Sequence, residues 1–390
     1  MDPFTSPERL ALRALVADFT RGDIAPHLAQ WELDGQIPRD LHRRAAEIGI
    51  LGIGSPEAVG GSGGDLVDVV TCTEALLENG ASGGLIAALF NHGIALPHIV
   101  DEADRRRDRG DIAGAAHLID HYVAPVLRGE AIAALAVTEP DGGSDVAHLR
   151  TRARRSEAGG WEVSGAKTYI TSGVRADVVV AAVRTGESGA AGITLMCLDP
   201  ASPGYAQPRR LDKMGWLCSD TAELAFDHVF VPDLDVLGEG EGFASLARHF
   251  VTERISIAVT AYATAQRALD LTLEWVRNRE TFGRPLSSRQ VVRHTLVEMH
   301  RQIDVARRYT RDIAIRYTQG EAVVAEAALA KKTAVDACTY VVDQAVQLHG
   351  GMGYMRESEV ERHYRDARVL GIGGGATEVM TDLVARLLGY

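Results

Sequence analysis

The hydrophobic pattern of this 390-residue chain changes its period twice, and this change restricts the fold more than any other feature. From Pro7 to about Leu127, apolar residues recur at three- and four-residue spacings, as in amphipathic helices, with a glycine-rich break at Gly49–Gly64. From about Ala131, short β-rich segments alternate with turn residues, and from Phe243 long helical periods return. We therefore expect an α+β multidomain protein with an N-terminal all-α domain (residues 1–130), a middle small β-barrel or sandwich (131–240) and a C-terminal four-helix bundle (241–390).

Local signals place several helix ends. Ser6, Pro7 and Glu8 form a predicted N-cap, first-turn proline and early acid. In the last domain the periodicity predicts helices over residues 255–279, 288–317, 321–349 and 379–388. The charged segment 101–122 contains the run RRRDR, for which we expect a solvated helix face or an insertion.

Composition excludes several classes of function. The formal net charge of −12 provides no basic face for nucleic acid or an anionic membrane. The N-terminus lacks a secretory signal pattern and no run of about 18 apolar residues stands out, so we expect a cytoplasmic protein without membrane insertion. The four cysteines show no CxxC spacing, so we expect neither a metal site nor a disulfide framework.

Two glycine- and hydroxyl-rich stretches are candidate binding loops. AVTEPDGGSD (Ala136–Asp145) follows a predicted apolar strand, and KTYITSG (Lys167–Gly173) has the same character. Glycine permits close approach of the backbone to a ligand, and the loops offer hydroxyl and N–H donors. An ordinary polar turn is the alternative for either stretch alone. A nicotinamide-binding fold is disfavoured because no strand leads through GxGxxG into a helix.

These two stretches resemble the flavin-contacting signatures of the acyl-CoA dehydrogenase family. The resemblance continues through DKMGW (Asp212–Trp216), RETFG (Arg279–Gly283), QLHGGMGYM (Gln347–Met355) and GGATEVM (Gly374–Met380), in the order of the family. It implies the helical, β, helical order of domains and an FAD cofactor. The dehydrogenation that the family's name implies needs a hydride acceptor, and flavin is required because no amino-acid side chain can accept a hydride.

The resemblance implies which residues border the flavin and the substrate. On the chain's own side these are Leu135, Val137, Thr138, Gly143, Ser144, Tyr169, Ile170 and Thr171, with Ser144 also near the entering thioester. Tyr169 stands where the family often has tryptophan and still supplies an aromatic face. Thr377 and Glu378 match positions on the nucleotide side of the flavin.

The family's flavin also lies across a subunit boundary. The matching positions, expected to contact a neighbour's flavin, are Arg279, Thr281, Phe282, Gln290, Gln347, Gly350 and Gly351. The guanidinium group of an arginine such as Arg279 can donate two parallel hydrogen bonds to pyrophosphate oxygens. We therefore expect a homotetramer.

The catalytic base departs from the common family pattern. Most members carry a carboxylate in a sequence like YEGT, but the matching residues here are glycine at Gly373 and Gly374. A minority, the isovaleryl- and long-chain-type enzymes, supplies it as Glu followed by Arg near the start of the first long C-terminal helix, and VTERI gives Glu253. In the alternative interpretation, Glu253 is an acidic residue in the first turn of the helix, where its negative charge interacts favourably with the helix dipole.

Three further roles follow from the resemblance. The N–H of Gly374 is expected to donate to the thioester carbonyl, Arg254 to orient the substrate, and Gly373 to widen the pocket. The implied activity is dehydrogenation of a saturated acyl-CoA to the trans-2-enoyl-CoA, with an electron-transferring flavoprotein as acceptor. An oxygen-reactive relative, either an oxidase or a flavin monooxygenase, and a non-catalytic partner subunit that binds acyl-CoA or flavin remain alternatives.

Overall fold

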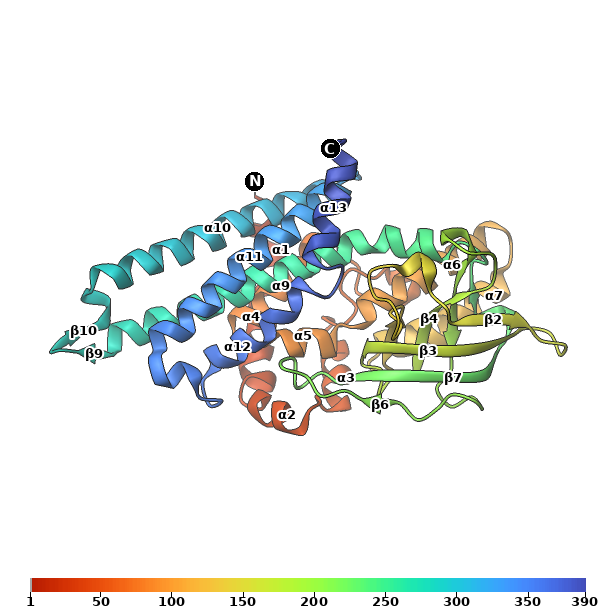
Figure 1. The fold of residues 1–390 in the computed structure, drawn as a ribbon, viewed down its shortest axis with the longest axis horizontal. Coiled ribbons are helices and arrows are strands. Elements are labelled where there is room, and N and C mark those ends of the chain that lie inside the picture. Colours follow the sequence, from red (N-terminus) through yellow and green to blue (C-terminus); the bar gives the residue numbers. More distant parts are fainter. Residues whose placement is uncertain (1) are drawn as a thin grey trace.

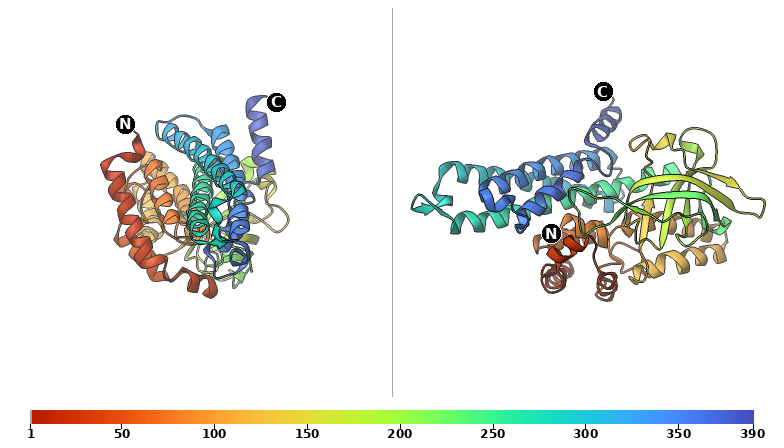
Figure 2. Two further views of the ribbon diagram at one scale, coloured as in Figure 1. Left: turned by 90° about the vertical axis from the view of Figure 1, so that its left-hand side faces the viewer. Right: turned by 60° about the horizontal axis from the view of Figure 1, so that its bottom comes forward.

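The computed structural model describes residues 2–390 and has the expected order of a helical, a β and a helical domain (Figure 1). The sheet lies at one end of an elongated molecule, and the helical bundle extends to the other end (Figures 1 and 2). The N-terminal helices lie along one side of both (Figure 2).

The N-terminal domain is built from short helices. They are α1 (Pro7–Phe19), α2 (Leu28–Asp34), α3 (Arg39–Glu47), α4 (Leu66–Glu78), α5 (Gly83–Leu89), α6 (His92–Asp108), α7 (Ile112–Leu118) and α8 (Ala124–Leu127). The predicted N-cap of α1 is confirmed, because the Ser6 hydroxyl accepts from the Arg9 N–H and Pro7 begins the helix. The predicted break between residues 49 and 64 lies between α3 and α4.

The charged segment 101–122 is helical except for a turn at residues 109–111, and the expectation of a solvated face is wrong for one of its arginines. Arg106 is only 6% exposed, and its guanidinium donates to the Leu234 and Val236 carbonyls and pairs with Glu102. This arginine therefore fastens α6 to the end of the sheet. Residues 83–108 are apolar enough to qualify by length and composition as a membrane span, but 61% of that window is buried inside the protein, as in a core helix.

The middle domain is a single sheet. Its strands are β1 (Ala133–Ala136), β2 (Arg152–Arg155), β3 (Trp161–Thr171), β4 (Val178–Arg184), β5 (Ile193–Leu198), β6 (Arg209–Arg210), β7 (Thr221–Val231) and β8 (Val236–Leu237). The order is β6-β7-β3-β2-β4-β5-β8, and β1 runs parallel to β4. Strand β5 is buried along its whole length, because α6 and α7 cover one face and the interior of the sheet covers the other.

The C-terminal domain contains the long helices α9 (Gly242–Asn278), α10 (Gln290–Thr318) and α11 (Val324–His349), the shorter α12 (Glu359–Ala367) and α13 (Thr377–Leu388), and the hairpin of β9 (Glu280–Thr281) and β10 (Arg284–Pro285). Small residues let α9 and α11 pack closely, since Ala258, Ala261 and Ala265 are fully buried against alanines of α11. Helix α13 projects from one side of the bundle (Figure 2) and packs on α11 through Met380, Val384 and Ala328.

One boundary of the bundle differs from expectation. The predicted first helix begins at Ile255, but α9 begins at Gly242, so Glu253 lies about three turns into it and not in its first turn. The added turns are fixed by the neighbouring domains. His98 and the Ser245 hydroxyl lie 2.7 Å apart, and Arg248 pairs with Asp101. The reading of Glu253 as a helix-dipole acid is therefore wrong.

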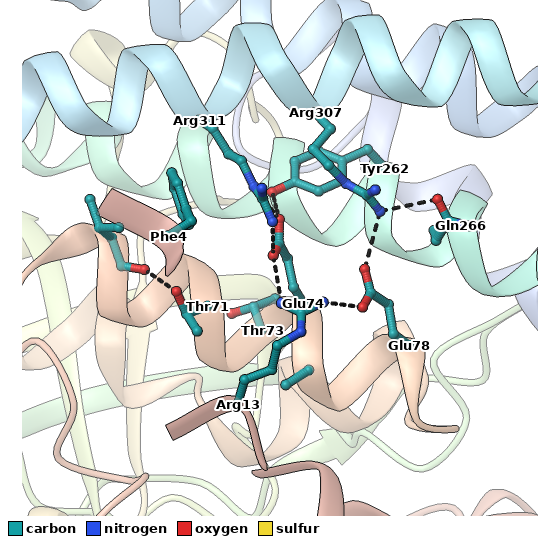
Figure 3. A network of polar contacts seen from close by, with 12 residues as sticks. Phe4, Arg13, Thr71, Thr73, Glu74, Glu78, Tyr262, Gln266, Arg307 and Arg311 are labelled. Atoms are coloured by element: carbon teal, nitrogen blue, oxygen red, sulfur yellow. Dashed lines mark hydrogen bonds and ion pairs between the residues drawn. The ribbon is translucent and has the colours of Figure 1, made fainter. Parts of the chain in front are cut away.

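A buried polar network joins the first and last domains (Figure 3). The Glu74 carboxylate on α4 is fully buried and accepts hydrogen bonds from Arg13, Tyr262 and Arg311 at 3.0, 2.7 and 2.8 Å. Burial opposes its ionisation, but the hydrogen bond and the charge of Arg311 outweigh burial and lower the pKa of Glu74. The network fixes α4 against α9 and α10, which orients the helices that carry the candidate site.

Candidate active site

The two signature stretches lie side by side at one edge of the sheet. The Thr168 N–H donates to the Thr138 carbonyl at 2.9 Å, which joins β3 to the segment after β1. KTYITSG is not the loop that we expected. Lys167 to Thr171 continue β3, because Ile170 and Thr171 pair with residues of β7 across an irregularity that begins at Lys167. The expected ligand-binding edge is therefore a strand end beside a loop.

A buried lysine holds the two stretches together. The Lys167 ammonium, which is fully buried, donates to the Val137 carbonyl at 3.0 Å and to Glu139 at 2.9 Å. Burial lowers the pKa of Lys167 to about 8 in spite of the Glu139 charge. Glu139 also accepts from the N–H groups of Arg150 and Thr151 at 2.5 and 2.8 Å, so one carboxylate closes both ends of the loop.

This edge presents the predicted flavin-contacting residues in different ways. Gly143, Ser144 and Tyr169 are exposed, while Leu135, Val137, Thr138 and Thr171 are half-buried. Ile170 turns its side chain into the core of the sheet, so only its backbone faces the edge. The Asn91 side chain donates to the Thr171 carbonyl at 3.1 Å and ties this edge to the N-terminal domain.

Tyr169 provides a test of whether the edge fits a flavin. Its side chain is 71% exposed and its φ is +60°, a left-handed conformation that is unfavourable for a bulky residue. Its neighbours Thr168 and Ile170 are buried, so the surrounding strand fixes it in this conformation. This large exposed ring lies on the strand that bonds to Thr138, and in the loop after Thr138 a Cβ would meet nothing at Gly142 and only Thr138 Cγ2, at 3.6 Å, at Gly143; such an edge fits a planar, polar cofactor such as a flavin.

The second set of predicted cofactor residues lies elsewhere. Arg279, Thr281, Phe282, Gln290, Gln347, Gly350 and Gly351 gather at the tip of the bundle, at the opposite end of the molecule from the sheet (Figure 1). Phe282 is 97% exposed at the turn of the hairpin, and a Cβ at Gly350 or Gly351 would meet nothing within 4 Å. Within one chain the structure does not bring this set to the Tyr169 edge.

Glu253 and Gly374 come together although they are distant in sequence. A Cβ built on Gly374 would overlap with Cδ1 of Ile257 and lie 3.3 Å from Oε1 of Glu253. Gly374 has a φ of +63°, which glycine adopts without strain. The Ile257 side chain therefore fills the place of a Cβ at position 374, and the carboxylate of Glu253 lies directly beside that place.

The surroundings of Glu253 favour a protonatable carboxyl. Burial raises the pKa of Glu253, while the charges of Lys331 and Arg254 oppose that rise. Arg254 is 8% exposed and its Nε has no hydrogen-bond partner within residues 2–390. Burial also lowers the pKa of Arg254. An unpaired buried cation beside a carboxyl suits a polar or anionic substrate group.

The remaining predicted residues lie at the surface near this point. Gly373 and Glu378 are exposed, and Glu378 lies in the first turn of α13. The Thr377 hydroxyl is 3.4 Å from the Gly371 carbonyl.

Cys218 is fully buried with a raised pKa caused by burial, so it is unreactive. Within residues 2–390 no group of three or more His, Cys, Asp or Glu side chains could hold a metal ion.

Sequence reasoning missed Lys331, which is 2% exposed and lies beside both Glu253 and Gly374. A signal was present, because Lys331 falls on the same stripe of α11 as Ala327, Ala334 and Cys338, all of which are buried. A lysine on an apolar stripe needs a polar partner inside the protein.

Comparisons with known proteins agree with this geometry. Three family models match: acyl-CoA dehydrogenase N-terminal domain over residues 6–105, middle domain over 134–229 and C-terminal domain over 240–389. A relative, the mitochondrial long-chain specific acyl-CoA dehydrogenase of Sus scrofa, is 33% identical over 98% of this chain and 86% of its own.

Two solved structures are similar over almost their full lengths. A crystal structure from Mycobacterium smegmatis, itself provisionally named an acyl-CoA dehydrogenase, is 55% identical with a TM-score of 0.94 over 99% of both chains. The acyl-CoA dehydrogenase of Geobacillus kaustophilus is 32% identical with a TM-score of 0.92 over 100% of both chains. Members of this family are FAD flavoproteins. The three domains in order, the full-length relatives and the paired signature stretches together make this chain a member of the acyl-CoA dehydrogenase family, and so an oxidoreductase.

Proposed function

We propose that this enzyme dehydrogenates a saturated acyl-CoA to the trans-2-enoyl-CoA, with Glu253 removing the α-proton. The observation that carries the proposal is the juxtaposition of Glu253 with the side-chain-free Gly374. A general base must lie within reach of the substrate proton, and burial, which raises the pKa of Glu253, makes its carboxylate a stronger base.

The second requirement is a donor for the thioester carbonyl, which gains negative charge as the proton leaves. The Gly374 N–H supports this role, since it has no acceptor among the residues that the structure describes. A backbone donor aimed at the developing oxyanion stabilises the enolate without a side chain. Arg254, buried and unpaired at its Nε, supports an orienting role for the polar part of the substrate.

The Tyr169 edge and the loop at Gly143 and Ser144 would hold FAD, which supplies the hydride acceptor when bound. Tyr169 would cover one face of the ring. Lys167 and Glu139 keep the two sides of this edge in place. We propose an electron-transferring flavoprotein as the acceptor of the electrons.

We further propose a homotetramer. The exposed set at the tip of the bundle, above all Phe282 and the open backbone at Gly350 and Gly351, supports contact with a neighbour's cofactor. Exposed apolar side chains continue along α10 at Val291, Val297 and Val305 and support a subunit contact there.

The test is Glu253→Gln, which keeps the size of the side chain and removes its basicity. Anaerobic mixing with a panel from butyryl- to palmitoyl-CoA should bleach the flavin of the wild type. The variant should keep its flavin spectrum and bleach roughly 10²- to 10⁴-fold more slowly, which is the usual contribution of a positioned base. Bleaching near the wild-type rate would remove Glu253 from the mechanism. Hydrogen peroxide formed at the rate of turnover in air would favour an oxidase, and purification without flavin would favour a supporting subunit.

A further inference from the structure

Lys331 on α11 makes its hydrogen bonds with the glycine loop that faces Glu253. Its buried ammonium donates to the Gly373 carbonyl and to the Gly375 carbonyl, the latter at 2.5 Å. The two carbonyls flank Gly374, so a single side chain holds the loop on both sides of the residue that has lost its side chain. A Cβ at Gly374 would lie 3.6 Å from this ammonium.

The geometry of the peptide bond makes these contacts directional. In a trans peptide the C=O of one residue and the N–H of the next point in opposite directions. The chain contains no cis peptide bond within its described residues. Because Lys331 holds the Gly373 carbonyl, the N–H of Gly374 is directed away from Lys331. A cation on the carbonyl also polarises the peptide and makes the N–H a stronger donor.

Glu253 lies near the same loop. Its Oε1 and the Lys331 Nζ are 3.3 and 3.6 Å from the same point, so they are at most about 7 Å apart. Among residues 2–390, these two groups form no direct ion pair with each other. Lys331 therefore acts on Glu253 through its field and leaves the carboxylate free to meet a substrate proton.

We propose that Lys331 is a positioning residue for the proposed α-proton removal. It aims and polarises the Gly373–Gly374 peptide as the oxyanion donor, and its charge favours the ionised form of Glu253. This inference rests on the proposed function and deepens it. The only other charged group that acts on Glu253 within the described chain is Arg254, on the same helix; Lys331 is the contribution of α11.

The titration of Lys331 fits this arrangement. Burial lowers its pKa to about 8, and the Glu253 charge opposes the shift. Near neutral pH the ammonium is therefore charged, while Glu253 titrates above its usual range.

The experiment compares three substitutions of Lys331 in the flavin-loaded oligomer. Lys331→Gln keeps hydrogen-bond donors but removes the charge, Lys331→Met removes both, and Lys331→Arg keeps both. The matched control is Lys332→Met, because Lys332 is the adjacent residue and pairs with Asp336 at the surface. The rate of anaerobic bleaching is measured from pH 5 to 9 with the acyl-CoA that bleaches the wild type fastest.

The two roles of Lys331 predict separate changes. In Lys331→Gln the acid limb of the rate profile should move to higher pH by about one to two units, as expected from losing a charge several ångströms away. In Lys331→Met the same shift should appear, and the rate on the plateau below pH 8, where the wild-type ammonium is charged, should also fall by roughly ten- to a hundredfold, a part of the value of an oxyanion donor. Lys331→Arg should keep the acid limb in place, and Lys332→Met should match the wild type.

The inference would be overturned if Lys331→Gln and Lys331→Met both showed the same acid limb and the same plateau rate as the wild type. If Lys331→Met does not fold, Lys331→Gln against Lys331→Arg decides, because a purely structural lysine would leave the acid limb of both unchanged. Failure of the underlying function is distinguishable. It would appear as bleaching by Glu253→Gln at the wild-type rate, whatever the Lys331 variants do.

Discussion

Gly374→Ala tests whether position 374 can accept a side chain beside Ile257 and Glu253. The substitution is unfavourable for two independent reasons. Gly374 has a φ of +63°, which costs an alanine roughly 1–2 kcal/mol. The new methyl would also overlap with Cδ1 of Ile257, and overpacking of this kind costs about 1–3 kcal/mol. We expect a total loss of about 3 kcal/mol in the free energy of unfolding.

A double-mutant cycle separates the two terms. Ile257→Val removes Cδ1, the atom that a Cβ at Gly374 would meet, and alone should cost about 1 kcal/mol. If the substitutions acted independently, the double variant would lose about 4 kcal/mol. We expect about 2 kcal/mol, because the overlap disappears and only the backbone strain and the lost methyl remain.

The assay is urea unfolding of the flavin-loaded protein, followed by tryptophan fluorescence. Gly373→Ala is the matched control, since its φ is not left-handed and its Cβ would meet only the Val369 carbonyl at 3.7 Å. It should change the free energy of unfolding by less than about 1 kcal/mol. A double variant as unstable as the sum of the single variants would refute the role of Ile257. A Gly374→Ala variant as stable as Gly373→Ala would refute the packing of this site altogether.

Two further predictions concern buried titratable side chains. Lys167→Met should lower the free energy of unfolding by about 3–5 kcal/mol and weaken flavin retention, because it leaves the Glu139 carboxylate buried without its cation. Equilibrium unfolding measures the first effect, and the flavin content after gel filtration measures the second. A variant that keeps both its stability and its flavin would contradict the role of the Lys167–Glu139 pair. The buried His98 should make the protein acid-sensitive. Burial lowers its pKa from 6.5 to about 3, so the unfolded chain binds a proton that the native protein does not, and stability present above pH 6.5 is lost as the pH falls toward 3, by about 2 kcal/mol at pH 5. Urea midpoints from pH 8 to 5 should fall less steeply in His98→Gln than in the wild type, and equal slopes would exclude His98.

Local patterns in the sequence were sufficient for the fold class, and the family resemblance led to the proposal of Glu253, in place of a residue at position 374, as the base. Helical and strand periods depend on which face of an element is buried, so they appear in the sequence itself. The glycine at Gly374 and the acid at Glu253 are also visible there, although nothing local shows that they meet. Where local signals were weak, prediction failed. The first turns of α9 lacked a clear period, because they contain polar residues such as Arg248 and His249, which bond to Asp101 on α6.

Only the tertiary structure shows which hydrogen bonds hold the site in place and how burial and neighbouring charges shift the pKa values of its groups. The sequence marks Lys331 and Lys167 as lysines within apolar or strand-forming stretches, but their partners lie on other elements, at Gly373, Gly375, Val137 and Glu139. The same holds for KTYITSG, which reads as a loop until β7 pairs with it. Periodicity reports burial, whereas hydrogen-bond partners and pKa shifts depend on distances between residues far apart in the chain, and only the folded arrangement sets those distances.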